Sequence, residues 1–169
     1  MIYADALGGN LWSINMSHVE PRADNATPHA LALLRVNRQV HAEAQLFPYL
    51  YNTFEGRHIG HLRTWIESLS DGHRKAITSI KFHKRSYIIE TAKGLDVSPI
   101  FWMDTPNLGE WKLEGLKRIH AEVVINKWGW DSDQEETEKA KVKALSKLCA
   151  QMELAHPGVV VDVVLKRGY

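Results

Sequence analysis

A single mixed α/β domain with a mostly parallel sheet is predicted for residues 1–169. Apolar residues recur at three- and four-residue steps in three stretches, as expected for amphipathic helices. A near-continuous apolar run over 159–165 is typical of a strand buried on both faces of a parallel sheet. After residue 50 the predicted elements largely alternate between strand and helix, which favours parallel strands covered by helices.

The first thirty residues predict short elements and a loop. Residues 1–7 are expected to be the end of a helix that Gly8-Gly9 terminates, because glycine tolerates the left-handed turn at a helix C-terminus. Residues 11–14 follow as a short strand. The segment 17–28 is polar and contains two prolines, so we expect a loop there.

The strongest helical pattern of the N-terminal half covers residues 28–47 and is ended by Pro48. Polar side chains occupy its other face. The pattern predicts a buried stripe formed by Leu33, Leu34, Val36, Val40 and Ala44.

A strand, a helix and a second strand are predicted next. Residues 51–55 have the β-branched and aromatic content of a strand. A second amphipathic helix is expected over 59–69, closed by Ser70-Asp71-Gly72. Residues 77–82 alternate in part and predict another strand, whereas glycine and proline interrupt 86–107, which we expect to be irregular.

The C-terminal third predicts strand, helix and strand. Residues 116–125 form a strand pattern, and the acidic start of the following segment suits the positive end of a helix over 132–155. The final strand is the apolar run 159–165. The buried stripe of the long helix is predicted to contain Val142, Leu145, Leu148, Cys149 and Met152.

The overall charge is almost balanced, with 21 basic and 20 acidic residues and a net charge of +1. That balance provides no general attraction to nucleic acid or to an anionic membrane. A single cysteine, Cys149, excludes an intrachain disulfide and indicates a reducing compartment. With no secretory signal pattern and no long apolar segment, we expect a cytoplasmic or nuclear protein without a membrane partner.

Two segments resemble the signature of a large fungal family of F-box-like proteins of unknown function. The run 33–44 (LLRVNRQVHAEA), followed by 51–54 (YNTF), is similar to the pattern LLxVxRQxxxEAxxxxYxxNTF. Ile2-Tyr3 and Leu7-Gly8-Gly9 resemble the IYxxxLGG element of that family. The resemblance covers about the first third of the chain.

The resemblance implies an F-box-like helical start over 1–50, joined to degenerate leucine-rich-repeat-like strand and helix units over 51–169. Members of the family carry an LPxEIR-type helix before the IY element, so this sequence is expected to be an N-terminally truncated member. An F-box uses that helix to bind a Skp1-type ubiquitin-ligase adaptor. The resemblance therefore implies a protein partner and a relation to substrate recognition.

No residue pattern in the sequence predicts catalysis, a cofactor or a metal site. His58 and His61 are spaced for one helix face, but no CxxC pair or HExxH motif adds further ligands. Cys149 lies on a predicted buried stripe, where a thiol usually acts as a small apolar group. The run 81–85 is the most basic, and a solvated strand edge explains it better than nucleic-acid binding.

Three exposed side chains are the candidate interaction residues. Trp128 and Trp130 flank a glycine beyond the end of a predicted strand, an edge where α/β sheets bind ligands and partners. Arg38, in the family-like motif, is the third. We therefore expect a non-enzymatic protein-interaction module. The alternatives are a small-molecule-binding protein or enzyme with a pocket lined by tryptophan and histidine, and, less favoured, a nucleic-acid-binding protein.

Overall fold

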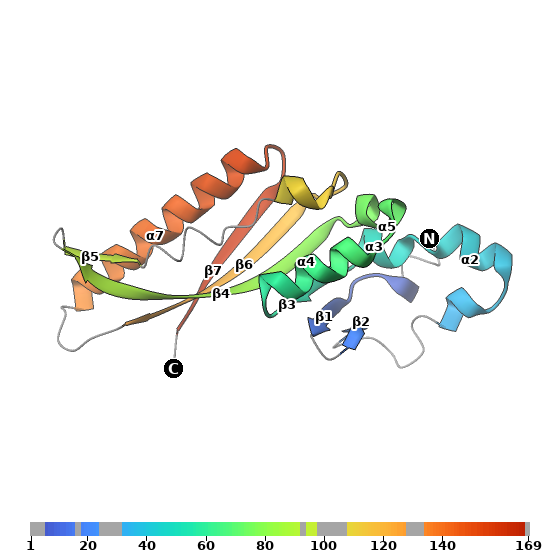
Figure 1. Ribbon diagram of the computed structural model, residues 1–169, viewed down its shortest axis with the longest axis horizontal. Helices are drawn as coiled ribbons and strands as arrows, with labels where there is room; N and C mark the ends of the chain where they lie inside the picture. Colours follow the sequence, from blue (N-terminus) through green and yellow to red (C-terminus); the bar gives the residue numbers. More distant parts are fainter. Residues whose placement is uncertain are drawn as a thin grey trace.

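The computed structural model describes residues 6–15, 18–23, 32–91, 94–97, 108–127 and 134–167. A seven-stranded mixed sheet forms its centre, with strand order β2-β1-β3-β4-β6-β7 and β5 paired to β4 (Figure 1). The strands are β1 (Leu11–Asn15), β2 (His18–Ala23), β3 (Thr53–Gly56), β4 (Ser79–Thr91), β5 (Gly94–Val97), β6 (Arg118–Lys127) and β7 (Val160–Arg167).

Five strands, β1, β3, β4, β6 and β7, are parallel and follow one another in chain order. β2 and β5 add antiparallel pairs at β1 and at the far end of β4. The prediction of an α/β fold with a mostly parallel sheet is confirmed.

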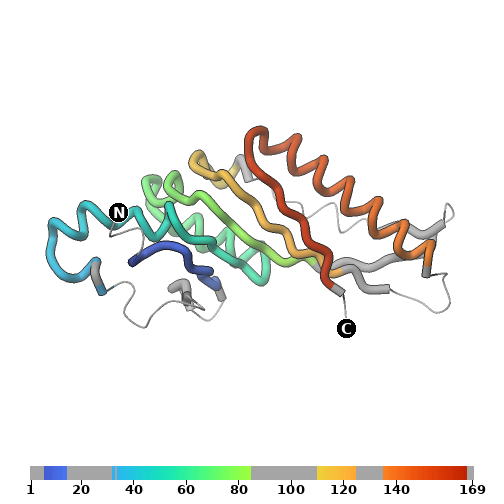
Figure 2. The backbone as a smooth tube through the Cα atoms, turned by 180° about the vertical axis from the view of Figure 1, so that it is seen from behind, coloured from blue at the N-terminus to red at the C-terminus, as the bar shows by residue number. Residues whose placement is uncertain are grey.

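Helices accompany the sheet along its length. Figure 1 shows α4 in front of the strands, and Figure 2, from behind, shows the strands in front of α4. The helical elements are η1 (Ala32–Arg35), α2 (Arg38–Ala44), α3 (Phe47–Tyr51), α4 (Ile59–Ser68), α5 (Asp71–Ala76), η2 (Leu108–Trp111) and α7 (Gln134–Ala155). None of the helices in the described part of the chain has the length and apolarity to cross a membrane.

The core lies between these helices and one face of the sheet. Strand register aligns Trp12, Phe54, Ile80 and Ile119 in one row across four strands, and all four are buried. Side chains alternate between the two faces of a strand, so the neighbouring positions point to the opposite face. From the helix side, Leu62, Ile66, Leu148 and Met152 complete the same cluster.

The prediction of one continuous helix over 28–47 is wrong. Its described part divides into η1, α2 and the start of α3, and Val36 is 64% exposed at the first break. The cause is local: the Asn37 side chain accepts a hydrogen bond from the Val40 N–H and begins a new helix. Ala44 is buried as predicted, whereas Leu34 and Val40 are half-buried.

Three further predictions are corrected. Residues 18–23, expected to be loop, form β2, where Pro21 is tolerated because β2 lies at the sheet edge. Ser70 does not close a helix but caps α5, since its hydroxyl accepts from the His73 N–H. Much of 86–107 is not irregular, because β4 continues to Thr91 and β5 pairs with it.

The C-terminal elements agree with the predicted order and in part with the predicted burial. α7 buries Thr137, Ala140, Ala144, Leu148 and Met152, whereas Val142 is 65% exposed. Leu148 and Met152 are buried as predicted, Leu145 packs against the core, and Cys149 is half-buried, so the prediction is wrong for Val142. β7 is not buried on both faces: it is the last strand of the sheet order, and its Val160 and Val164 are about half exposed.

Asn52 links the N-terminal segment to the start of β3. Its side-chain amide donates to the backbone oxygens of Leu7 (2.6 Å) and Pro48 (2.7 Å), and its Oδ1 accepts from the Asn10 N–H (2.8 Å). The residue is only 2% exposed. It serves as the C-cap of α3 directly before a strand, as expected of a turn or cap residue.

We expect Asn52→Ala to lower the free energy of unfolding by about 2–4 kcal/mol, because it removes three hydrogen bonds and leaves their buried partners unsatisfied. Urea unfolding followed by circular dichroism measures this. Asn37→Ala is the matched control, since it removes one exposed helix cap worth about 1 kcal/mol. Equal losses for the two variants would contradict the linking role of Asn52.

Candidate interaction surface

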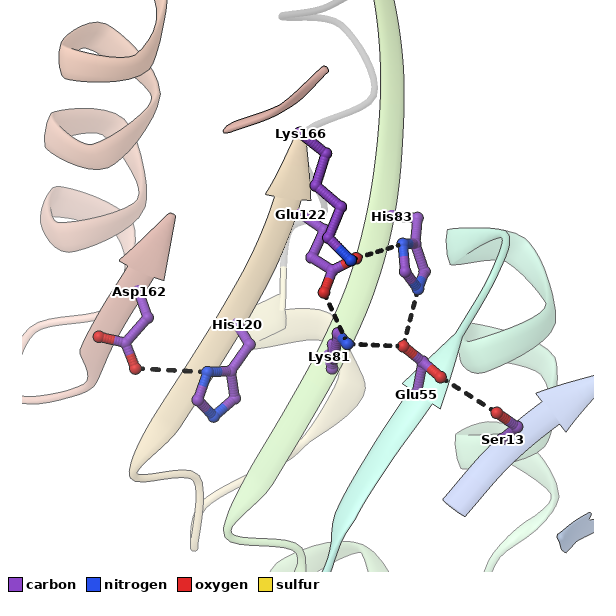
Figure 3. A network of polar contacts seen from close by, with 8 residues as sticks. All are labelled: Ser13, Glu55, Lys81, His83, His120, Glu122, Asp162 and Lys166. Carbon is purple, nitrogen blue, oxygen red and sulfur yellow. Dashed lines mark hydrogen bonds and ion pairs between the residues drawn. The ribbon is translucent and has the colours of Figure 1, made fainter. Parts of the chain in front are cut away.

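The sheet face opposite the core carries a band of polar side chains. The residues next to the buried row align as Ser13, Glu55, Lys81, His120 and Asp162, one from each of the five parallel strands. We call this side of the sheet the open face. Figure 3 shows these side chains together with three neighbours from the same face, His83, Glu122 and Lys166.

Lys81 lies between two carboxylates on the neighbouring strands. Its Nζ is 2.9 Å from Glu55 Oε1 and 2.7 Å from Glu122 Oε1. The three side chains are largely buried, with exposures of 19%, 10% and 11%. One cation from β4 thus neutralises charge from both β3 and β6.

His83, two residues further along β4, makes a second bridge between the same carboxylates. Its Nε2 is 2.7 Å from Glu55 Oε1, and its Nδ1 is 3.0 Å from Glu122 Oε2. Lys166 Nζ also reaches Glu122 Oε2 at 3.0 Å, and the Ser13 hydroxyl donates to Glu55 (Figure 3).

These contacts hold Glu55, Lys81 and Glu122 in their charged forms. Burial raises the pKa of Glu55, but hydrogen bonds from Lys81 and His83 outweigh it and the pKa lies below its usual 4.5. For Glu122 burial is likewise outweighed, by Lys81 and Lys166. Burial lowers the pKa of Lys81, yet its two carboxylate partners raise it above 10.5. Such groups are poor proton donors or acceptors near neutral pH.

His120 and Asp162 form the outer end of the row. His120 Nδ1 is 3.3 Å from Asp162 Oδ2. Burial lowers the pKa of His120 below 6.5, and Arg118 adds to this, while Asp162 acts in the opposite direction. His120 is therefore mainly neutral at pH 7 and presents a hydrogen-bonding ring instead of a second fixed charge.

A hollow of about 400 Å³ lies on the open face between these groups and the amino ends of β1 and β3. Its ionisable lining residues on β4, β6 and β7 are Lys81, His120, Glu122 and Asp162. Tyr51, at the end of α3, and Val164, on β7, add apolar surface and are 43% and 52% exposed. Polar groups flanked by exposed apolar side chains are typical of a protein-binding surface.

A second, smaller hollow of about 220 Å³ lies on the helix side. Trp12, Tyr49 and Phe54 line it together with His41 and His73. Tyr49 is stacked between Phe54 and His73, with ring centroids 5.7 and 4.6 Å apart. The indole N–H of Trp12 is buried and donates to no atom of the described residues.

Of the three predicted interaction residues, Arg38 alone lies within the described residues. Arg38 is exposed at the first turn of α2, at one end of the molecule (Figure 1), and lines neither hollow. Trp128 and Trp130 lie outside the described residues. A third hollow, of about 820 Å³, is lined by residues 57–60, by residues 82–84 of β4 and by Val124 of β6.

The interpretation of the basic run 81–85 as a strand edge is wrong. β4 is a central strand paired with β3 and β6. Alternation places Lys81 and His83 on the open face, whereas Phe82 is buried in the core. On that face, both Lys81 and His83 are paired with the carboxylates of Glu55 and Glu122.

The remaining candidates for chemistry are isolated. His58 and His61 contact edge to face, with ring centroids 5.1 Å apart. Within the described ranges, no three His, Cys, Asp or Glu side chains are grouped so that they could hold a metal ion. Cys149 is half-buried, and burial raises the pKa of its thiol, which disfavours the nucleophilic thiolate.

Sequence reasoning missed the open-face network. A signal was present in Thr53-Phe54-Glu55 and Lys81-Phe82-His83, where polar residues alternate with buried ones within two predicted strands. Pairing those strands in parallel would have suggested that Glu55 and Lys81 are neighbours.

Comparison of the chain with protein-family models, with curated proteins and with solved structures found no match.

We expect Lys81→Met to lower the free energy of unfolding at pH 7 by about 2–3 kcal/mol, because two largely buried carboxylates lose their shared cation. Glu55 and Glu122 have lowered pKa values, so their contribution is present above pH 4.5 and is lost as the pH falls further. The raised pKa of Lys81 means that its contribution is lost above pH 10.5. The loss of unfolding free energy caused by Lys81→Met should therefore be smaller below pH 4.5 and above pH 10.5 than at pH 7.

Urea unfolding of both proteins between pH 3 and pH 11 measures the deficit. Lys139→Met, which breaks an exposed pair with Glu135, is the control and should leave the unfolding midpoint almost unchanged. A pH-independent deficit would show that Lys81 acts through packing instead of charge.

Proposed function

We propose that this chain is a non-enzymatic protein-interaction domain that binds its partner on the open face of the sheet. The observation that carries the proposal is the hollow of about 400 Å³ on that face, with Tyr51 and Val164 exposed beside a paired charge network. Exposed aromatic side chains next to partly dehydrated polar groups are typical binding hot spots.

The electrostatics of the network support binding over catalysis. Glu55, Lys81 and Glu122 are held charged by one another, so none has the pKa near 7 that a general acid or base requires. Charges fixed in position favour recognition, because a partner with a complementary arrangement is accepted and others are repelled. The neutral ring of His120 offers a further hydrogen bond beside them.

The sequence resemblance suggests which kind of interaction domain this is. A relation to F-box adaptors would make the open face a substrate-recognition surface, with a Skp1-type adaptor bound elsewhere on the protein. Trp128, Trp130 and Arg38 remain proposed contacts in that setting. Direct binding to a purified Skp1-type adaptor, with and without an upstream extension of the chain, tests this relation separately from the open face.

We expect Tyr51→Ala to reduce capture of the partner by about tenfold or more, because an exposed aromatic beside the hollow is removed. Affinity capture from a fungal lysate, quantified by mass spectrometry against the wild type, measures the loss. Leu154→Ala is the control, since Leu154 is 86% exposed on α7 and lines none of the three hollows described above.

The proposal fails if Tyr51→Ala and Leu154→Ala capture the same proteins in the same amounts as the wild type. A variant with Trp128 and Trp130 both changed to alanine runs in parallel. Loss of the same proteins from this variant would extend the binding surface to the carboxyl edge of the sheet.

Small-molecule binding is the second candidate, and the helix-side hollow favours it. Aromatic side chains form much of its lining. The Trp12 N–H, which meets no acceptor among the described residues, costs about 1–3 kcal/mol unless an acceptor is supplied. A cavity of about 150 Å³ already holds benzene, so 220 Å³ suits a substituted aromatic ring. A carbonyl or carboxylate oxygen on that ring would satisfy the indole.

We expect benzoate or indole-3-carboxylate to raise the melting temperature of the wild type in thermal unfolding, because a ligand that binds only the folded state stabilises it. Trp12→Phe keeps an aromatic ring but removes the donor, and should abolish the shift. Trp111→Phe, a buried tryptophan outside this hollow, should retain it. No shift for the wild type at millimolar ligand argues against the site.

A further inference from the structure

β7 is an eight-residue strand at the end of the sheet order. It pairs with β6 on one side, and no strand among the described residues pairs with its other side. A long edge strand is a template for pairing with another chain unless something blocks it. Val160 and Val164 are both about half exposed on the open face, where they alternate with the charged residues Asp162 and Lys166.

The backbone groups that face outward can be identified from the ladder with β6. The Val160 N–H donates to Lys117 O at 2.9 Å, so Val160 bonds inward. In a parallel ladder every second residue bonds to the same neighbour, so Asp162, Val164 and Lys166 also bond inward. Val161, Val163 and Leu165 therefore direct their N–H and C=O groups to the free edge.

We propose that two copies of this chain associate through antiparallel pairing of their β7 strands, with Val164 opposite Val164 of the second copy. In a symmetric pair the two residue numbers of each opposed couple have a constant sum. Residues whose N–H and C=O groups face the free edge must oppose each other, and these residues all have odd numbers. The sum is therefore even, and the two-fold axis passes between two copies of the same residue.

Charge selects the centre. Centring on Val164 places Asp162 opposite Lys166 twice, once on each side of the two-fold axis, and pairs Val163 with Leu165. Centring on Asp162 or on Lys166 would oppose two like charges, which is unfavourable for directly facing residues. Centring on Val163 sets Asp162 against Val164. Only the Val164 centre matches both the charges and the apolar residues.

Asp162 and Lys166 are able to reach across the edge. Their side chains are 48% and 56% exposed, and their contacts within the chain are to Arg118, His120 and Glu122. Couples that are not hydrogen-bonded have Cα atoms about 4.5 Å apart, which brings opposed side chains into contact. The pairing would join the two open faces into one continuous surface on the same side of the doubled sheet.

Sedimentation velocity across protein concentrations from about 1 to 100 μM, at low salt, tests the pairing. The wild type should shift from monomer to dimer in this range. V164D places like charges face to face at the centre and should raise the dissociation constant by about tenfold or more. V142D is the matched control on α7, where Val142 is 65% exposed, and should dimerise like the wild type.

The charge pair is tested by reversal. D162K and K166D should each weaken the dimer, whereas D162K/K166D should restore it, because opposite charges again face each other. Within one chain the double reversal worsens both sets of contacts, since it puts a cation near Arg118 and an anion near Glu122. Restoration therefore cannot arise from the fold of the monomer, and circular dichroism confirms that each variant is folded.

A wild type that stays monomeric at 100 μM overturns the proposal. So does a dimer that V164D leaves intact, or a double reversal that is no better than the single ones. These outcomes are independent of partner capture by the open face, because capture by a monomer would leave the proposed function standing.

Discussion

The rest of this structure depends on one constraint, which is that each new parallel strand is added on the same side of the previous one. β1, β3, β4, β6 and β7 are parallel and adjacent in chain order. Crossover connections between parallel strands are almost always right-handed, so a sheet that never reverses its order places its crossovers on the same face. In the described part of the chain, the helices and the core lie on one face, and the other face carries the polar network.

The open face explains why charged residues lie in the middle of central strands. Parallel strands are usually covered on both sides and apolar throughout. Here β3 and β4 bury Phe54 and Phe82 toward the helices but direct Glu55 and Lys81 to the open side. Lateral pairing across neighbouring strands replaces a second layer of helices. The cost of partly dehydrating each ion is offset by its neighbours, because Lys81 and His83 each contact both carboxylates.

The motif that resembles F-box-like proteins has one part in the interior of the fold and one part on its surface. Its NTF end is structural: Asn52 ties the N-terminal segment and α3 together, and Phe54 is buried in the core. Thr53 connects to β4 through a hydrogen bond between its hydroxyl and that of Ser79. The RQ portion lies on exposed α2, where Gln39 donates to Glu43, and that surface is free of packing demands from the core. Residues of the motif thus mark both the interior and the surface.

Local patterns in the sequence determined the α/β class, the strands at 11–14 and 116–125, and helices α4 and α7, because periodicity and capping act over a few residues. They did not determine that Val142 faces solvent or that β7 is an edge, since both depend on what packs against them. The open-face network joins residues as far apart as Ser13 and Lys166. Only the order and register of the strands decided that these side chains meet, because a parallel sheet makes neighbours of positions that no local pattern relates.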